Sequence, residues 1–224
     1  MERLLSMALA VAVLLTGAPS FANDGGDVQL PVDATMDIYR AGGYEDGSDG
    51  VAPTVYSFAA RDGQYLTFSA VVGSWSCTGS VPEYGPDGIL NGDGCVPPGG
   101  ANMADVGSFA GYYSTDFSGA LVGMFLEDTL PSSPPPSLRF YDTDSSDGGI
   151  PTDFKVLSPR IGQVFFIGDG LTGTGSGAIQ LFRVPPKATH LYLGYIDSCS
   201  GTVVPSCYSD NRGRLSAVFR IQTP

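Results

Sequence analysis

The residues of this sequence with the clearest capacity for chemistry lie near its C-terminal end. Asp197 ends one strand-like segment, and Asp210 and Asn211 lie shortly before another. This spacing predicts two carboxylates and one amide oxygen at the mouths of two strands. Calcium binds about six to eight oxygen ligands of this kind. The segment Asp210–Gly213 is equally typical of a hairpin turn, so the residue pattern leaves both a calcium site and a simple turn open.

A second acidic segment, Asp142–Asp147, has the composition of a calcium loop. An EF-hand loop needs glycine at its sixth position and a helix on each side. Asp147 occupies that position, and no helical pattern flanks the segment. A solvated turn therefore explains it better, and a second calcium site there stays open. Two carboxylates at a suitable separation could also serve a glycoside hydrolase, but no feature of the sequence selects a pair. We expect no catalytic activity.

Two further motifs fit ordinary turns and strands. Gly168–Gly173 has the GxGxxG spacing of a dinucleotide site, which requires a helix to begin there. Glycines and another strand-like segment follow instead, which predicts a turn. His190 is the one histidine of the chain, so a Ser-His-Asp triad or a multi-histidine zinc site would depend on it. Its neighbours form a strand pattern, and we expect an exposed strand histidine.

Residues 1–22 have the layout of a secretory signal peptide. Arg3 precedes the apolar run Leu4–Leu15, and small residues flank a cleavage point after Ala22. The apolar run is shorter than the roughly 20 residues that span a bilayer. We therefore expect cleavage and a secreted, extracellular or periplasmic product without a transmembrane anchor.

The cysteine count indicates an oxidising compartment. An even number of cysteines in an exported chain is typical of disulfide bonds. Three pairings are possible for the four cysteines Cys77, Cys95, Cys199 and Cys207. Pairing between neighbours closes two glycine-rich loops, so we favour Cys77–Cys95 and Cys199–Cys207. A Cys77–Cys207 crosslink is the alternative.

The composition favours strands and turns over helices. Thirty-one glycines and seventeen prolines divide the chain into short segments. In the last segment, Leu215, Ala217, Phe219 and Ile221 alternate with more polar residues, which is the period of a half-buried strand. We expect an all-β fold, a sandwich or jelly roll of about eight or nine strands. Residues 31–224 would form this single domain, after a flexible lead-in over residues 23–30.

The net charge of −12 limits the partners. Such a chain repels phosphate backbones, so nucleic acid is not an expected partner. An acidic surface suits solubility and divalent cations.

The sequence resembles the small bacterial calcium-dependent galactophilic lectins. It also resembles a broader set of exported proteins with the same C-terminal half, many of them PEP-CTERM-sorted. The Tyr-x-Asp/Asn-Asn-x-Gly block near the C-terminus is the specific part. The matching blocks are scattered over most of the mature chain: Ser74–Thr78, Tyr84–Gly88, Ser118–Val122, Gln163–Gly170, Leu191–Asp197 and Tyr208–Leu215.

The resemblance implies a jelly-roll, galactose-binding-like β-sandwich that holds one Ca²⁺ ion. The side chains that match the lectins' ligands are Asp197, Asp210 and Asn211, and the matching backbone carbonyls are those of Cys207 and Thr78. Sugar hydroxyls would complete the coordination shell. The lectins carry asparagine where Asp210 stands, a change that keeps an oxygen ligand and adds negative charge.

The resemblance also implies aromatic rings beside the sugar. Trp75 and Tyr84 are the candidates for this role, and Trp75 fits a core position equally well. The lectins' sugar-contacting histidine and glutamine have no clear match in residues 89–107. Calcium is therefore better supported than galactose.

Together these patterns predict a secreted, calcium-dependent carbohydrate-binding module without catalysis. Its partner would be a glycan or polysaccharide, and assembly into a homo-oligomer is open. The alternative is an extracellular structural or surface-matrix protein in which calcium only pins the loops, and a glycoside hydrolase comes third. The first function requires a coordination position that a sugar can reach, whereas the second does not.

Overall fold

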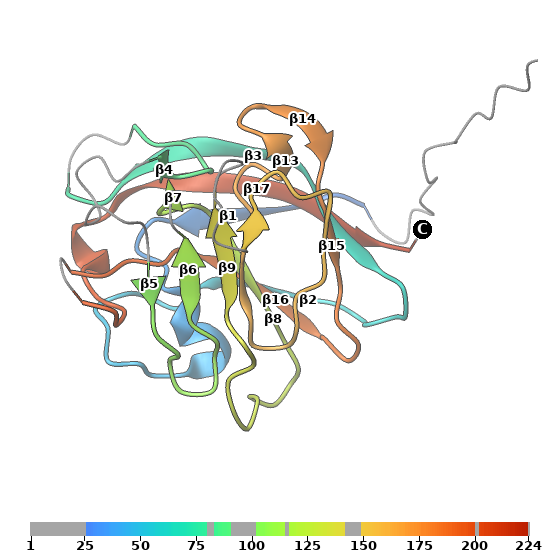
Figure 1. Ribbon diagram of the computed structural model, residues 1–224, viewed down its shortest axis with the longest axis horizontal. Helices are drawn as coiled ribbons and strands as arrows, with labels where there is room; N and C mark the ends of the chain where they lie inside the picture. The colour runs from blue at the N-terminus through green and yellow to red at the C-terminus, as the bar shows by residue number, and fades with distance from the viewer. Residues whose placement is uncertain are drawn as a thin grey trace, which may run out of the picture.

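The computed structural model describes residues 26–79, 83–90, 102–114, 117–141, 149–199 and 202–223. The expected signal peptide, Cys95 and the acidic segment Asp142–Asp147 lie outside these residues. Within them the protein is all-β, as predicted (Figure 1), with two short 3₁₀ helices, η1 (Ile38–Gly43) and η2 (Tyr208–Asp210).

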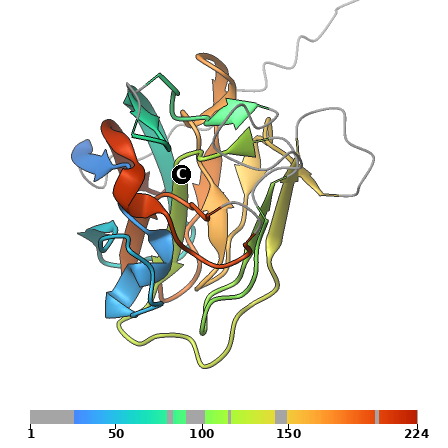
Figure 2. The same ribbon diagram turned by 90° about the vertical axis from the view of Figure 1, so that its left-hand side faces the viewer.

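One main sheet contains both the first and the last strand of the described residues, β1 and β17. Its five strands follow the order β1-β17-β3-β15-β11. The long strands β17 and β3 pair antiparallel from Arg212 opposite Ser76 to Gln222 opposite Tyr65. Figure 2 shows the red C-terminal strand and the blue N-terminal segment on the same side of the molecule. The strand bounds are β1 (Val28–Asp33), β17 (Arg212–Gln222), β3 (Tyr65–Ser76), β15 (Leu181–Arg183) and β11 (Val156–Leu157).

The start of this sheet corrects the expected boundary of the lead-in. β1 begins at Val28, which pairs with Phe219, and Leu30 pairs with Ala217. The last three residues of the segment expected as a flexible lead-in therefore belong to a strand. Val28, Leu30 and Val32 alternate with other residues, which is a strand pattern, and the pairing with β17 places this segment at the edge of the sheet.

The second main sheet is antiparallel and has the order β12-β8-β16-β2. All five residues of its inner strand β8 are buried. One face packs against the first sheet, and η1 contacts β8 as well. The bounds are β12 (Val164–Phe166), β8 (Val122–Leu126), β16 (His190–Gly194) and β2 (Thr54–Ser57).

Smaller sheets complete the fold. The described residues contain seventeen strand segments, where the sequence predicted about eight or nine strands. Many have only two or three residues, because glycine and proline interrupt the pairing at short intervals. A third sheet has the order β10 (Ile150–Pro151), β9 (Leu138–Tyr141), β6 (Tyr112–Ser114), β5 (Asn102–Met103), and two-stranded pairs join β13 (Leu171–Gly173) to β14 (Ser176–Ile179) and β4 (Ile89–Leu90) to β7 (Phe117–Ser118).

Aromatic rings fill the space between the two main sheets. Phe165 and Phe182 meet with centroids 5.4 Å apart, and Phe219 meets Tyr56 edge-on at 5.4 Å. The predicted alternation in β17 is confirmed, because Leu215, Ala217 and Phe219 are fully buried and Ile221 is partly buried. Burying one such side chain contributes roughly 1.5–3 kcal/mol. The two sheets thus form a sandwich, and the jelly-roll connection order stays a prediction.

Both motifs interpreted as ordinary structure lie in turn and strand structure, although the turn covers only the first half of Gly168–Gly173 and His190 is less exposed than expected. Gly168–Gly170 forms a turn that leads into β13, and no helix begins there. The Asp169 carboxylate accepts hydrogen bonds from the N–H groups of Leu171 and Gly175, which closes this turn. His190 is the first residue of β16 and is partly exposed.

Candidate metal centre

The connection between β1 and η1 brings the candidate residues to one end of the sandwich. Ala34 N–H donates to the carbonyl of Gly213 at the start of β17. Two residues later, Met36 accepts a hydrogen bond from the N–H of Tyr195, which directly follows β16. This segment therefore ties the end of β16 to the start of β17, which lie in different sheets. Asp197 lies two residues after Tyr195, and Asn211 lies two residues before Gly213. The two side chains are therefore held near each other.

Tyr208 forms the centre of this end of the molecule. It is fully buried, and its hydroxyl accepts a hydrogen bond of 3.0 Å from the N–H of Asp197. The Asp49 carboxylate accepts from the N–H groups of Tyr208 and Ser209, at 2.9 and 3.1 Å. A Cβ at Gly50 would lie 2.6 Å from the Cβ of Asp37 and 3.0 Å from the Tyr208 ring, so only glycine fits there. These contacts fix η2 against the acidic loop.

Two buried oxygen atoms in this region have no hydrogen-bond donor among the described residues. Asp197 accepts from the N–H of Ser198 through Oδ1, at 2.7 Å, while its buried Oδ2 has no partner. Asn211 is 1% exposed and donates through Nδ2 to the carbonyl of Ala34, at 3.0 Å. This bond orients the amide and leaves Oδ1 buried and unpartnered. A buried acceptor without a partner costs about 1–3 kcal/mol.

The electrostatic surroundings of the Asp197 carboxyl group favour a bound cation. Burial raises the pKa of this carboxyl group to about 7. The adjacent Asn211 amide and the Ser198 N–H act in the opposite direction, whereas the negative charges of Asp210 and Asp49 raise the pKa further. A bound divalent ion would reverse this balance, because it favours the ionised carboxylate. Oxygen-only donors with excess negative charge are the ligands that hard cations prefer.

The remaining expected ligands lie around this pair. Asp210 is exposed at the end of η2, and Cys207 precedes η2 with a left-handed backbone, φ 67°. Thr78 is exposed, and a Cβ at the next residue, Gly79, would lie 3.6 Å from the carbonyl oxygen of Asp210. The loop after β3 therefore reaches η2. In the described part of the chain no three His, Cys, Asp or Glu side chains form a metal-binding group. A centre here depends on Asn211 and on backbone carbonyls.

A disulfide closes the loop between the two halves of the candidate centre. Cys199 and Cys207 are bonded, as predicted, with Cα atoms 5.2 Å apart. Inside this loop, Ser206 N–H donates to the Asp197 carbonyl. Because Cys207 is used here, the alternative Cys77–Cys207 crosslink is excluded. Cys77 is also disulfide-bonded, and its expected partner Cys95 lies outside the described residues.

The structure separates the two aromatic candidates. Trp75 is 2% exposed, and its ring packs against Tyr195 and Tyr84 with centroids 5.4 and 5.7 Å away. Its indole N–H donates to the Gly85 carbonyl at 3.1 Å, and a Cβ at Gly119 would overlap the ring. Trp75 is thus a core residue, and the expected contact of its face with a sugar is not supported. Tyr84 is partly exposed and remains a candidate.

Sequence reasoning missed Asp49 and Asp37. Asp49 contacts η2 across 159 residues of sequence, so no local pattern could have placed it there. Asp37 is fully buried and accepts hydrogen bonds from the Tyr39 N–H and the Ser48 hydroxyl. Burial, and next the neighbouring carboxyl group of Asp46, raise the pKa of Asp37 to about 7. The acidic composition of residues 44–50 was the available signal.

The described residues include no helix that is both long and apolar enough to cross a membrane. Comparisons with models of protein families, with curated proteins and with solved structures found no match for the chain.

Proposed function

We propose that the protein is a calcium-dependent carbohydrate-binding module of the cell exterior or periplasm, without catalytic activity. The observation that carries the proposal is the pair of buried oxygens, Asp197 Oδ2 and Asn211 Oδ1, that have no hydrogen-bond partner among the described residues. A calcium ion between them would satisfy both.

The chemistry of the ligands favours calcium over other metals. All expected donors are oxygen atoms, from the carboxylates Asp197 and Asp210, the amide Asn211 and the carbonyls of Cys207 and Thr78. Calcium accepts such a mixed and irregular shell, whereas zinc and copper favour nitrogen and sulfur ligands. When bound, the ion would supply positive charge that ionises Asp197 and open positions for neutral oxygen ligands.

The exposure of one side of the centre favours a carbohydrate ligand. Asp197 and Asn211 form the buried side, whereas Asp210 and Thr78 are exposed. An ion held between these residues would border solvent, where two neighbouring sugar hydroxyls can replace water. Tyr84 offers a partly exposed ring, and its backbone pairs with Trp75, three residues before Thr78. Multivalent presentation would raise the weak affinity of a single sugar.

The alternative, a structural ion in a matrix protein, rests on a specific observation. The candidate ligands come from three separate segments, and two of these, around Asp197 and around Asp210, are already held by Tyr208, Asp49 and the Cys199–Cys207 disulfide. An ion could bind between these segments with all of its coordination positions filled by protein atoms. It would then stabilise the fold without binding a sugar.

The first experiment tests the ion. Thermal unfolding is recorded in calcium and in a chelator for the exported protein, for Asp197→Ala, and for the control Asp153→Ala, which removes an exposed carboxylate elsewhere. Calcium at a hundredfold excess over Kd should stabilise the native protein by about 2.7 kcal/mol. The control should keep this difference and Asp197→Ala should lose it. Equal melting curves for the native protein in calcium and chelator would remove the calcium site.

The second experiment separates the lectin from the scaffold. The tetramerised protein is applied to an array of neutral glycans in calcium and in chelator. Binding that requires calcium and is lost in Asp210→Ala supports the carbohydrate-binding function. Calcium-dependent stabilisation with no glycan retained would assign the ion a structural role instead.

A further inference from the structure

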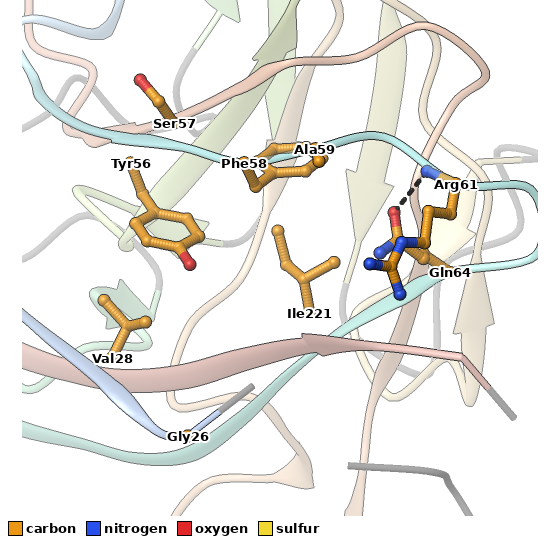
Figure 3. A pocket seen from close by; sticks show the side chains of 9 residues that line it. All are labelled: Gly26, Val28, Tyr56, Ser57, Phe58, Ala59, Arg61, Gln64 and Ile221. Atoms are coloured by element: carbon orange, nitrogen blue, oxygen red, sulfur yellow. Dashed lines mark hydrogen bonds between the residues drawn. The ribbon is translucent and has the colours of Figure 1, made fainter. Parts of the chain in front are cut away.

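A pocket lies at the opposite end of the sandwich from the candidate metal centre. It has a volume of about 320 Å³ and opens between β1 and β2, the edge strands of the two main sheets. Ile221, near the end of β17, forms its middle (Figure 3). β17 crosses the molecule from η2 to the C-terminus (Figure 1). At about 3.3 Å per residue, Arg212 and Ile221 are roughly 30 Å apart, so the two sites share no residue.

One part of the lining is apolar and fixed by packing. Tyr56 and Phe58 present nearly parallel rings, with centroids 6.2 Å apart and an interplanar angle of 14°. Each ring packs edge-on against a buried phenylalanine of the core, Tyr56 on Phe219 and Phe58 on Phe125. Because the core holds both rings, their orientation exists before any ligand arrives. Val28 adds aliphatic surface on the β1 side.

Two polar groups at this pocket have no hydrogen-bond partner among the described residues. Gln64 is 4% exposed, and its Oε1 accepts a hydrogen bond of 2.8 Å from the backbone N–H of Arg61. This bond orients the amide and leaves Nε2 as a donor without a partner, and the Tyr56 hydroxyl has none either. Neither atom is fully buried, so a ligand in the pocket can reach both. Figure 3 shows Tyr56 and Gln64 on either side of Ile221, which places the two groups at opposite rims.

The residues that line the pocket offer no uncommitted charge to a ligand. Arg61 is the one charged residue among them, and it already takes part in an interaction of its own. A charged ligand would leave water without gaining an opposite charge, which is costly. The pocket therefore favours a neutral ligand with apolar surface for the rings and hydroxyl groups for Gln64 and Tyr56.

We propose that this pocket binds a neutral pyranose with equatorial hydroxyl groups, the type of sugar unit found in β-linked glucans. Such a ring has flat C–H faces and carries its hydroxyl groups around the rim. The C–H faces would bury apolar surface against Phe58 and Ile221, while rim hydroxyls would bond to Gln64 Nε2 and the Tyr56 hydroxyl. The volume is at the lower end for ligand pockets, which suits one or two sugar rings. Since no residue of the candidate metal centre takes part, this site needs no calcium and stands independently of the proposed function.

The test is a titration of the exported protein with cellobiose in a chelator, followed by saturation-transfer NMR. The chelator removes any contribution from a calcium-bound centre. Cellobiose should bind in the millimolar range, because a small sugar offers few atoms to the protein. Glucitol is the control probe, since this open-chain polyol carries similar hydroxyl groups without a fixed C–H face. It should bind roughly tenfold more weakly.

Matched variants locate the binding. Tyr56→Phe removes only a hydroxyl that the fold does not use, so it should weaken cellobiose binding about two- to tenfold without lowering the melting temperature. Tyr113→Phe makes the same change at a partly exposed tyrosine of β6, in the third sheet, and should leave binding unchanged. Phe58→Ala removes a ring and should weaken binding roughly tenfold. Asp197→Ala should retain cellobiose binding in full.

Three outcomes would overturn the assignment. The first is the absence of saturation transfer to cellobiose at tens of millimolar, and the second is equal affinity for glucitol. The third is binding that Tyr56→Phe leaves unchanged or that Tyr113→Phe weakens as much, which would place the sugar elsewhere. Cellobiose binding that appears only in calcium and disappears in Asp197→Ala would assign the sugar to the metal centre, so a failure of this site is distinguishable from a failure of the proposed function.

Discussion

The two ends of β17 differ in the side chains that surround them. At the Arg212 end, buried oxygen atoms of Asp197 and Asn211 lack donors. At the Gln222 end, the aromatic rings of Tyr56 and Phe58 line a pocket with no acidic side chain among its lining residues. β17 pairs with β3 along its whole length between these ends. The strand pairing is therefore the same at both ends and does not explain how they differ. The difference lies in which side chains are placed at each end, with unpartnered oxygen atoms at one end and aromatic rings at the other.

The two ends are also held by different means. The candidate metal centre is fixed by a disulfide and by two hydrogen bonds. The Asp197 N–H donates to the Tyr208 hydroxyl, and the Tyr208 N–H donates to the Asp49 carboxylate. The pocket is fixed by aromatic packing of Tyr56 and Phe58 on the core. Perturbations of the shared core should therefore affect both ends, whereas local changes should affect one.

The largest effect is expected for Phe219→Ala in the middle of β17. Phe219 is fully buried and contacts Tyr56 and Phe68. The cavity left behind should lower the free energy of unfolding by about 3–5 kcal/mol, measured by urea denaturation. Val218→Ala, on the outer face of the same strand, should cost less than about 1 kcal/mol. Equal costs would mean that this strand does not face the core as described.

The next effect concerns only the metal end. Asn211→Ala removes the buried Oδ1 and the hydrogen bond to the Ala34 carbonyl. Stabilisation by calcium, about 2.7 kcal/mol at a hundredfold excess over Kd, should disappear from melting curves. The control Gln29→Ala removes an exposed amide that bonds Ser216 and should retain the calcium effect.

Opening the Cys199–Cys207 disulfide should have a slightly smaller effect. Replacing both cysteines by serine removes a crosslink across a separation of eight residues, which corresponds to about 2.5 kcal/mol in the chain-entropy estimate. Calcium affinity, measured by titration, should fall because Asp197 and Asp210 lose their shared tether. Unchanged calcium affinity would show that Tyr208 and Asp49 suffice to hold the centre.

The smallest effect is expected for Asp37→Asn and depends on pH. The pKa of Asp37 is raised from 3.8 to about 7 by burial first and by Asp46 next. The folded state therefore holds a proton that the unfolded state releases, and stability should fall as pH rises from about 4 to 7. Asparagine does not ionise, so the variant should lack this part of the slope.

At pH 8 the Asp37→Asn variant should gain about 1–2 kcal/mol. The shift from 3.8 to about 7 corresponds to about 4 kcal/mol, at about 1.4 kcal/mol per pKa unit, and the loss of the acceptor for the Ser48 hydroxyl offsets the larger part of it. Denaturant titrations at pH 4.5, 6 and 8 measure the slope. A native protein with no loss of stability over this range would show that Asp37 is ionised without cost in the fold.

The sequence by itself determined the class of the fold and its local features. The alternation of Leu215, Ala217 and Phe219 predicted the buried face of β17, because side chains in a strand point alternately to opposite faces. Glycine and proline spacing predicted an all-β chain, although the strands proved shorter and more numerous than expected. The Cys199–Cys207 bond followed from closeness in sequence. Export and the sugar ligand stay predictions.

Only the tertiary structure decided which distant groups meet. It buried Trp75 under Tyr84 and Tyr195, placed Asp49 against η2, and ordered β1 from Val28 by pairing it with β17. It also formed the pocket, since Val28, Tyr56 and Ile221 come from three strands. Sequence patterns report the faces of a single strand. The partners of each face depend on how sheets pair and stack over long separations, which no local pattern encodes.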